Sequence, residues 1–143
     1  MYHQVDALFD ACDVFIMAAA VSDFTPIEYS EHKVKKDTAK RILHLAKTID
    51  ILKTMGERKQ GQFIVGFAAE SENLEANAKA KLQEKKCDWV IANQIGEEGT
   101  GFASDNNTIT ILKKDGTRET HGPTSKLALA ETIIQAIACL LYT

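Results

Sequence analysis

Residues 13–21 read DVFIMAAAV, an apolar stretch in which polar and apolar side chains do not alternate. A strand that is buried on both faces has this pattern, and such strands are typical of parallel sheets. Two further stretches look alike, FIVGFAA at 63–69 and DWVIAN at 88–93. Segments 49–60 and 73–86, which precede them in turn, are predicted to be helices. Short buried strands that alternate with helices predict an open α/β sheet with helices on both faces.

The C-terminal third of the chain has a different pattern. Residues 107–121 (NTITILKKDGTRETH) are predicted to form a hairpin whose turn is Asp115-Gly116. Pro123 and Thr124 are expected to open a last amphipathic helix that ends at Leu141. Together with the strands above, this predicts a three-layer, Rossmann-like open sheet that is mostly parallel and carries a C-terminal hairpin.

The start of the chain does not fit a standard nucleotide-binding sheet. The first dozen residues place apolar side chains at helical spacing, and Arg41–Lys47 is a candidate for a further short strand. A doubly wound nucleotide-binding protein normally has a glycine-rich phosphate loop after its first strand. Because no such loop occurs early here, either the chain is not of this type or its first βα units lie upstream of Met1. Residues 1–143 are therefore interpreted as a single, truncated domain.

Composition excludes several classes of protein. The 143 residues are 45% hydrophobic and 26% charged, with a formal net charge of −3, as is ordinary for a globular domain. The acidic balance disfavours a nucleic-acid-binding module, since any basic function must be local. No apolar run is long enough to cross a membrane. Cys12, Cys87 and Cys139 form no CxxC pair, which favours a reducing, cytoplasmic compartment over a disulfide framework.

Polar and small residues gather where the predicted strands end. Ligands of open parallel sheets bind at the carboxyl ends of strands. The first strand exits through small residues and then Asp23, and the third through Asn93 and a glycine-containing loop. The second exits through Gly66, Phe67, Ala68 and Ala69. Small residues at strand ends are also common for packing reasons alone, so each of these ends is by itself a weak signal.

Lysines follow two of these strand ends. Lys33, Lys35 and Lys36 lie on the segment after the first strand, and Lys81 and Lys85 share one face of the helix predicted after the second. Ammonium groups from both segments would neutralise the oxygens of a polyphosphate if they converged. The alternative reading is that all are solvated surface lysines. Spacing alone does not decide between the two.

Five motifs, taken together and in order, resemble the phosphopantothenate–cysteine ligase family (phosphopantothenoylcysteine synthetase of coenzyme A biosynthesis). In bacteria this ligase is often fused to a flavin-dependent decarboxylase, which nothing in this chain resembles. The resemblance is to the C-terminal portion of the ligase and covers nearly the whole chain. The motifs are AAVSDFTP (19–26), HKVKK (32–36), IDIL (49–52), VGFAAES (65–71) and GFASDNNTITIL (101–112).

The resemblance implies a reaction. The carboxylate of 4'-phosphopantothenate attacks the α-phosphate of CTP, which gives an acyl-cytidylate and pyrophosphate, and the amine of cysteine then displaces CMP. Lys33 stands at the position of the family's essential lysine, where its charge would offset negative charge on the phosphates. Asp23 stands at the position of a nucleotide-site aspartate that would also suit Mg²⁺ or a similar divalent cation. A loop-capping role for Asp23 remains open.

The other site residues come from the same resemblance. Ile49 replaces the proline that usually opens the nucleotide-contacting turn, so the stiffness of that turn is in question. Phe67 corresponds to a residue beside the nucleotide, although a core aromatic is the alternative. The positions implied to bind nucleotide are Asp23, Lys33, Ile49, Asp50, Ile51, Leu52, Phe67, Lys81 and Lys85.

The family also builds its phosphopantothenate pocket from two subunits, which implies a homodimer. A sequence argument for this is that the strand in 101–112 has no obvious helix to cover it, so an uncovered edge would invite a partner. We expect CTP to be preferred to ATP, and these residues alone not to complete the reaction. A non-catalytic nucleotide-binding or interaction fragment is the alternative function.

Overall fold

The computed structural model describes residues 1–28, 31–32, 42–70, 73–94 and 105–141. Within these ranges the elements follow the predicted alternation. In chain order they are α1 (Tyr2–Phe9), β1 (Val14–Met17), β2 (Phe24–Pro26), β3 (Leu45–Lys47), α2 (Ile51–Arg58), β4 (Phe63–Glu70), α3 (Leu74–Glu84), β5 (Trp89–Gln94), β6 (Asn106–Lys113), β7 (Arg118–Ser125) and α4 (Lys126–Leu141).

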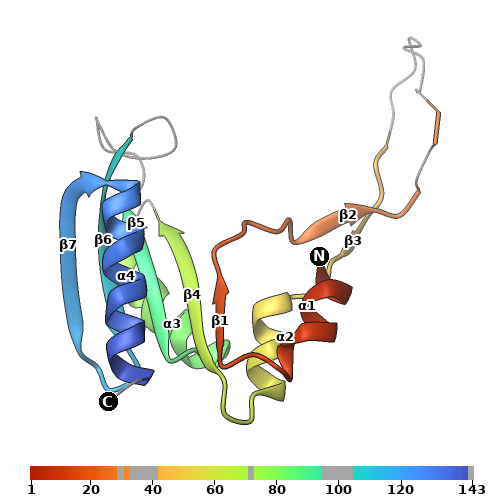
Figure 1. The fold of residues 1–143 in the computed structure, drawn as a ribbon. Helices are drawn as coiled ribbons and strands as arrows, with labels where there is room; N and C mark the ends of the chain where they lie inside the picture. The colour runs from red at the N-terminus through yellow and green to blue at the C-terminus, as the bar shows by residue number, and fades with distance from the viewer. Residues whose placement is uncertain (29–30, 33–41, 71–72, 95–104, 142–143) are drawn as a thin grey trace.

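Five strands form one sheet in the order β1-β4-β5-β6-β7 (Figure 1). The three predicted buried strands are neighbours and run parallel, with Val14 opposite Phe63 and Val65 opposite Trp89. β6 is antiparallel to both β5 and β7. The prediction of an α/β fold with a mostly parallel sheet is confirmed.

Helices cover both faces of the sheet, which gives three layers (Figure 1). On one face, Phe9 of α1, Met55 of α2 and Leu82 of α3 pack against sheet residues such as Ile64 and Val90. On the other face, α4 is the one helix among the described residues, and it packs through its buried residues Leu129, Ile133 and Ile137. The alternation of these two clusters along β4 and β5 explains why both strands are apolar except at their carboxyl ends.

Two details of the C-terminal region differ from expectation. Pro123 lies within β7 and does not open a helix, because β7 is an edge strand, where a residue without an N–H group is tolerated. α4 begins three residues later, and Ser125 Oγ accepts a hydrogen bond from the N–H of Ala128 at 3.2 Å. The hairpin turn itself is confirmed, with Gly116 at a φ of 88°.

The strand expected to lack a cover is in fact covered. Ile109 and Ile111 of β6 are 4% and 0% exposed and pack in the same cluster as the buried face of α4. Both edges of β6 are paired, one with β5 and the other with β7. The sequence argument that this strand invites a partner subunit was therefore wrong.

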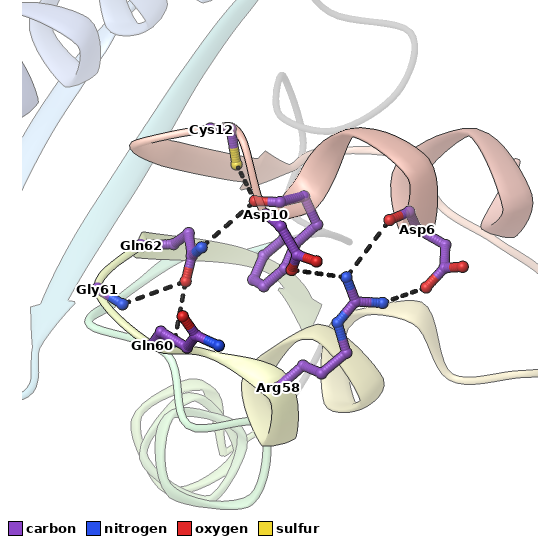
Figure 2. Close-up of polar contacts among 8 residues, drawn as sticks. Asp6, Asp10, Cys12, Arg58, Gln60, Gly61 and Gln62 are labelled. Atoms are coloured by element: carbon purple, nitrogen blue, oxygen red, sulfur yellow. Dashed lines mark hydrogen bonds and ion pairs between the residues drawn. The ribbon is translucent and has the colours of Figure 1, made fainter.

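A charged clamp fastens α1 to α2. The Arg58 guanidinium pairs with the carboxylates of Asp6 and Asp10, the latter at 2.7 Å, as Figure 2 shows. The same group lies 5.6 Å from the ring centroid of Phe9, which is 1% exposed. The clamp keeps Phe9 in the core and fixes the helix that leads into β1.

β2 and β3 form a separate antiparallel ribbon that projects away from the main sheet (Figure 1). Its residues are exposed throughout, including large apolar side chains. Phe24 and Leu45 are about half exposed (50% and 49%), and Leu43, just before β3, is 68% exposed. An isolated two-stranded ribbon is marginally stable in water. We therefore expect another group to cover the apolar surface of this ribbon.

In the part of the chain that the structure describes, no helix is both long enough and apolar enough to span a bilayer.

Candidate functional site

One cavity of about 210 Å³ lies where β1 ends, between the first turn of α2 and one face of α3. Its walls come from segments far apart in the sequence. β1 leads to it through small residues, and the base of the β2–β3 ribbon closes one side. The residues implied to bind nucleotide that line this cavity are Asp23, Ile49, Asp50, Ile51, Leu52, Phe67, Lys81 and Lys85.

Lys33, the residue with the implied catalytic role, lies outside the described residues, as do Lys35 and Lys36. The structure therefore gives no contact for it. Of the two lysine groups expected to converge, it places only Lys81 and Lys85 at the cavity.

Asp50 organises the floor of the cavity. It is the N-cap of α2, where its carboxylate accepts a hydrogen bond from the N–H of Lys53 at 2.9 Å. Its other oxygen accepts from Lys85 Nζ at 2.8 Å. Partial burial alone would raise the pKa of Asp50, but the hydrogen bonds from Lys85 and Lys53 outweigh it and hold that pKa below its ordinary value. Asp50 is thus an ionised capping residue.

Lys85 is held on both sides by acids. Besides Asp50, its Nζ lies 2.7 Å from Oε1 of Glu84. Burial would lower the pKa of Lys85, yet the two carboxylates raise it above its ordinary value. The Lys85 side chain is 17% exposed, and its ammonium group is charged. An incoming phosphate would compete with Asp50 and Glu84 for this group.

Lys81 points across the cavity toward the sheet. Its Nζ donates a hydrogen bond to the carbonyl oxygen of Phe67 in β4. The Phe67 side chain is half-buried and packs with the cluster on the α4 face. The alternative reading, a core aromatic, thus describes the ring, while the backbone carbonyl of Phe67 contacts the cavity lysine.

Asp23 lies at the base of the ribbon. Its backbone carbonyl accepts a hydrogen bond from the N–H of Thr48 at 2.9 Å, and Thr48 Oγ1 donates to the carbonyl of Ser22. These bonds join the segment after β1 to the segment before α2. The Asp23 side chain is exposed and lines the cavity.

The IDIL segment divides between surface and core. Ile49 is 51% exposed, whereas Ile51 and Leu52 are 4% and 6% exposed and belong to the core beneath α2. The cavity wall here is therefore the start of a helix anchored by its own apolar side chains. Its first turn also presents the positive end of the helix dipole to the cavity.

Sequence reasoning did not single out Met17, Ala19, Val21 or Thr48, which also line the cavity. Ala19 and Val21 belong to the small-residue exit from the first strand, which was noted as a class. Thr48 carried no signal of its own, because its role is to bond across the base of the ribbon.

The acidic residues at the cavity suit a cation carried by phosphates. Among the described residues, no group of three or more His, Cys, Asp or Glu side chains could hold a metal ion. Asp50 is engaged by Lys85 and its N-cap bond, so among the described residues Asp23 is the carboxylate still available at the cavity. Mg²⁺ is commonly bound by one or two carboxylates together with substrate phosphates, so this donor set fits such a cation.

The fold and the cavity define a class. The chain is a three-layer α/β domain whose polar cavity lies at the carboxyl end of a parallel strand, where proteins of this class bind their ligands. A family model described as the C-terminal domain of DNA/pantothenate metabolism flavoproteins matches residues 1–140. The chain belongs to that family, and the resemblance seen in the sequence is confirmed.

Two curated relatives and one solved structure are similar to this chain over nearly its full length. The chain is 43% identical over 140 residues to the coenzyme A biosynthesis bifunctional protein CoaBC of Bacillus subtilis (strain 168), covering 98% of this chain and 34% of that protein. It is 36% identical over 135 residues to a cysteine/cysteine sulfinic acid decarboxylase of an unknown prokaryotic organism, covering 94% and 38%. A crystal structure of the C-terminal domain of CoaBC superimposes with a TM-score of 0.76 at 31% identity, covering 99% of this chain and 61% of that one.

The chain thus spans about a third of the length of these curated relatives. The two relatives carry different activities in their names, although both match this chain over nearly its full length.

Proposed function

We propose that this chain forms the nucleotide-binding part of a ligase that joins 4'-phosphopantothenate to cysteine in coenzyme A biosynthesis, with CTP as the co-substrate. The main support for the proposal is that residues from distant parts of the sequence converge on one cavity. Residues between positions 23 and 85 that correspond to the family's nucleotide positions surround one cavity. The similarity to CoaBC, a protein of coenzyme A biosynthesis, supports the same reading.

The proposed reaction has two steps. An oxygen of the phosphopantothenate carboxylate forms a bond to the α-phosphorus of CTP, and the bond to the leaving pyrophosphate breaks. The amine of cysteine then attacks the activated carbonyl carbon, loses a proton and displaces CMP, which leaves an amide. Negative charge on the phosphates increases during the first step, so fixed cations at the cavity lower its barrier.

The described residues have separate roles in this proposal. Lys81 and Lys85 bind phosphate oxygens, and the first turn of α2 adds its positive dipole end. Asp23 contributes one ligand to a divalent cation carried by the triphosphate. Lys33 supplies the charge nearest the α-phosphate, as the family pattern implies. Asp50 holds Lys85 in place until phosphate arrives.

The size of the cavity fits only part of the ligand set. Small-molecule sites usually enclose roughly 300–1,000 Å³. At about 210 Å³, the cavity formed by the described residues is smaller than that range. In this proposal, further walls are therefore needed to enclose a nucleoside triphosphate and phosphopantothenate together.

A non-catalytic nucleotide-binding or interaction fragment remains the second candidate. Calorimetric titration with CTP and with ATP, each with Mg²⁺, tests binding directly. We expect CTP to bind more tightly. Equal affinity, or tighter binding of ATP, would remove the base preference, and the absence of binding by either would remove the nucleotide site.

Turnover is best tested in a chimera. The matched segment of the Bacillus subtilis CoaBC protein is replaced by residues 1–140 of this chain, and pyrophosphate release is followed with CTP, phosphopantothenate and cysteine. We expect release that requires all three substrates. A folded chimera that binds CTP and releases no pyrophosphate would favour the non-catalytic alternative.

We also propose that the protein acts as a homodimer in a reducing, cytoplasmic compartment. Support for the dimer comes from the exposed apolar side chains of Phe24 and Leu45 in the β2–β3 ribbon and of Leu43 just before β3. Pairing with a second copy would bury them. Support for the compartment is that none of the three cysteines, all of which the structure describes, forms a disulfide.

A further inference from the structure

A second, larger cavity of about 650 Å³ lies on another side of α3. It is bounded by the end of α2 and the residues after it, by α3, and by the turn between β6 and β7. The two cavities share α3 as a wall but have no lining residue in common. Its volume falls within the roughly 300–1,000 Å³ that small-molecule sites usually occupy.

Positive charge dominates this second cavity. Six basic side chains line it, against the two carboxylates of Glu57 and Glu75. Three of the cations are already engaged: Arg118 with Glu75 at 2.7 Å, Lys113 with Glu119 at 2.6 Å, and Lys59 with Asp88. The other three cations that line the cavity are Lys79, Lys86 and Lys114.

These three lysines come from two distant parts of the chain, the C-terminal half of α3 with the residues just after it, and the turn after β6. Lys79 lies within α3, Lys86 just after its end, and Lys114 in the turn after β6. All are exposed, and among the described residues none makes an ion pair with a carboxylate. Unpaired cations that converge from separate elements on one cavity favour an anionic ligand.

Lys86 carries an independent signal in its backbone. It adopts the left-handed conformation, with a φ of 51°. The N–H of Cys87 bonds to the carbonyl of Leu82 at 3.0 Å, so Lys86 occupies the position after the helix end where glycine is usual. A lysine there costs conformational energy that a glycine would avoid. Strained residues of this kind are often retained for what their side chains do.

The floor of the cavity is apolar. Leu82 and Leu112 are both 9% exposed, and Cys87 is 1% exposed. Burial raises the pKa of the Cys87 thiol to about 11, so the thiol stays neutral and behaves as a small apolar group. A ligand that fits must therefore combine a negative group at the rim with an apolar part below.

We propose that this second cavity is a binding site for a phosphorylated organic molecule, whose phosphate binds Lys79, Lys86 and Lys114 and whose apolar part rests on Leu82, Cys87 and Leu112. The proposal does not depend on the ligase function, because it uses none of the residues of the first cavity.

The test is a calorimetric titration of the whole chain with 1-naphthyl phosphate, 1-naphthol and inorganic phosphate. We expect 1-naphthyl phosphate to bind at one site, about 10-fold or more tightly than either of the other probes, since only it offers both parts. Comparable binding of inorganic phosphate would mean that the apolar floor contributes nothing, and the proposal would be wrong.

Variants then locate the site. K86Q and K114Q together should weaken 1-naphthyl phosphate binding about 10-fold or more, whereas K47Q, on the exposed ribbon, should leave it unchanged. K85Q tests whether the probe binds in the first cavity instead, because Lys85 lines that cavity and not the second one. If K85Q weakens binding and K86Q with K114Q does not, the probe occupies the first cavity and the proposal fails.

K86G tests whether weaker binding comes from the lost charge or from a loss of folding. It removes the charge while relieving the left-handed backbone, so it should raise the melting temperature and still weaken binding. Unchanged binding by this stable variant would contradict a role for Lys86.

Discussion

Nζ of Lys85 lies 2.8 Å from Oδ2 of Asp50, and this pair joins the residue that follows α3 to the N-cap of α2 across 35 positions of sequence. The contact fixes the two helices that line the first cavity. It also leaves a cation and a carboxylate facing the same space, so ligand binding and fold stability both depend on it.

D50N should lower the stability of the chain in a pH-dependent way. Asn is as good an N-cap as Asp, so the variant removes mainly the charge. Because the pKa of Asp50 is lowered by folding, its carboxylate stabilises the fold above its ordinary pKa of about 4, and this contribution is lost as the pH falls through the lower folded value. The pair is partly exposed, so we expect about 0.2–1 kcal/mol at pH 7.

Urea unfolding of both proteins at pH 7 and pH 3 measures this difference. The gap in unfolding free energy should narrow at pH 3. A gap of equal size at both values would mean that the ionised carboxylate is not what stabilises the helix pair.

K33Q should abolish most of the turnover of the chimeric ligase. Removal of one charged contact to a developing transition-state charge typically costs about 100-fold or more in rate. K47Q is the control, a lysine on the exposed strand β3 that does not line the first cavity. Pyrophosphate release compares the variants, and a folded K33Q enzyme with near-normal release would exclude Lys33 from the catalytic role.

G56A should destabilise the fold strongly. A Cβ at Gly56 would lie 1.9 Å from the carbonyl oxygen of Lys85, which is backbone and cannot rotate away. Overpacking of this kind typically costs about 1–3 kcal/mol. α2 and the end of α3 would have to separate, and both cavities lie beside that contact.

G61A is the control for this prediction. A Cβ at Gly61 would meet no atom within 4 Å, so its effect should stay within about 0.5 kcal/mol of the parent chain. Urea denaturation of the two variants should separate them clearly. Equal stabilities would show that α2 can shift without loss.

Variants at the exposed apolar residues near the ribbon test the proposed dimer. Leu43 and Leu45 are 68% and 49% exposed, so replacing both with serine removes little from the core of a single copy. We expect the double variant to shift the parent chain from dimer to monomer in sedimentation velocity. L127S, on an equally exposed part of α4, should not. A parent chain that is monomeric at high concentration would contradict the proposal outright.

Local sequence patterns were enough to predict the main sheet. Residues 14–17, 63–69 and 89–92 are apolar because successive side chains of each strand pack in the clusters on opposite faces of the sheet, and that cause acts within each segment alone. Pro123 could not be placed in the same way, because it is tolerated in β7 only through its position at the sheet edge. The cover of β6 by α4 likewise depends on packing between distant segments.

The first cavity, like the sheet, could be predicted from the sequence only in part. Spacing alone placed Lys81 and Lys85 on one helix face, and the family pattern related them to Asp23 and Asp50. Nothing in the sequence indicated that Asp50 and Glu84 would hold Lys85, or that Phe67 would contribute a carbonyl while its ring packs on the other face. The second cavity was missed because its lysines come from two distant parts of the chain, the end of α3 and the turn after β6.

K86G should stabilise the chain, although it deletes a side chain at the second cavity. Lys86 has a φ of 51°, a conformation that costs a residue with a Cβ roughly 1–2 kcal/mol and glycine almost nothing. Glycine also gains more freedom in the unfolded chain, worth about 0.4–1 kcal/mol in the opposite direction. The net gain should therefore be a few tenths to about 1 kcal/mol. K86A is the decisive control, because it removes the same charge but keeps the Cβ. If urea unfolding gives K86A the same gain in stability as K86G, Lys86 destabilises the fold through repulsion among the cavity lysines and not through its left-handed backbone.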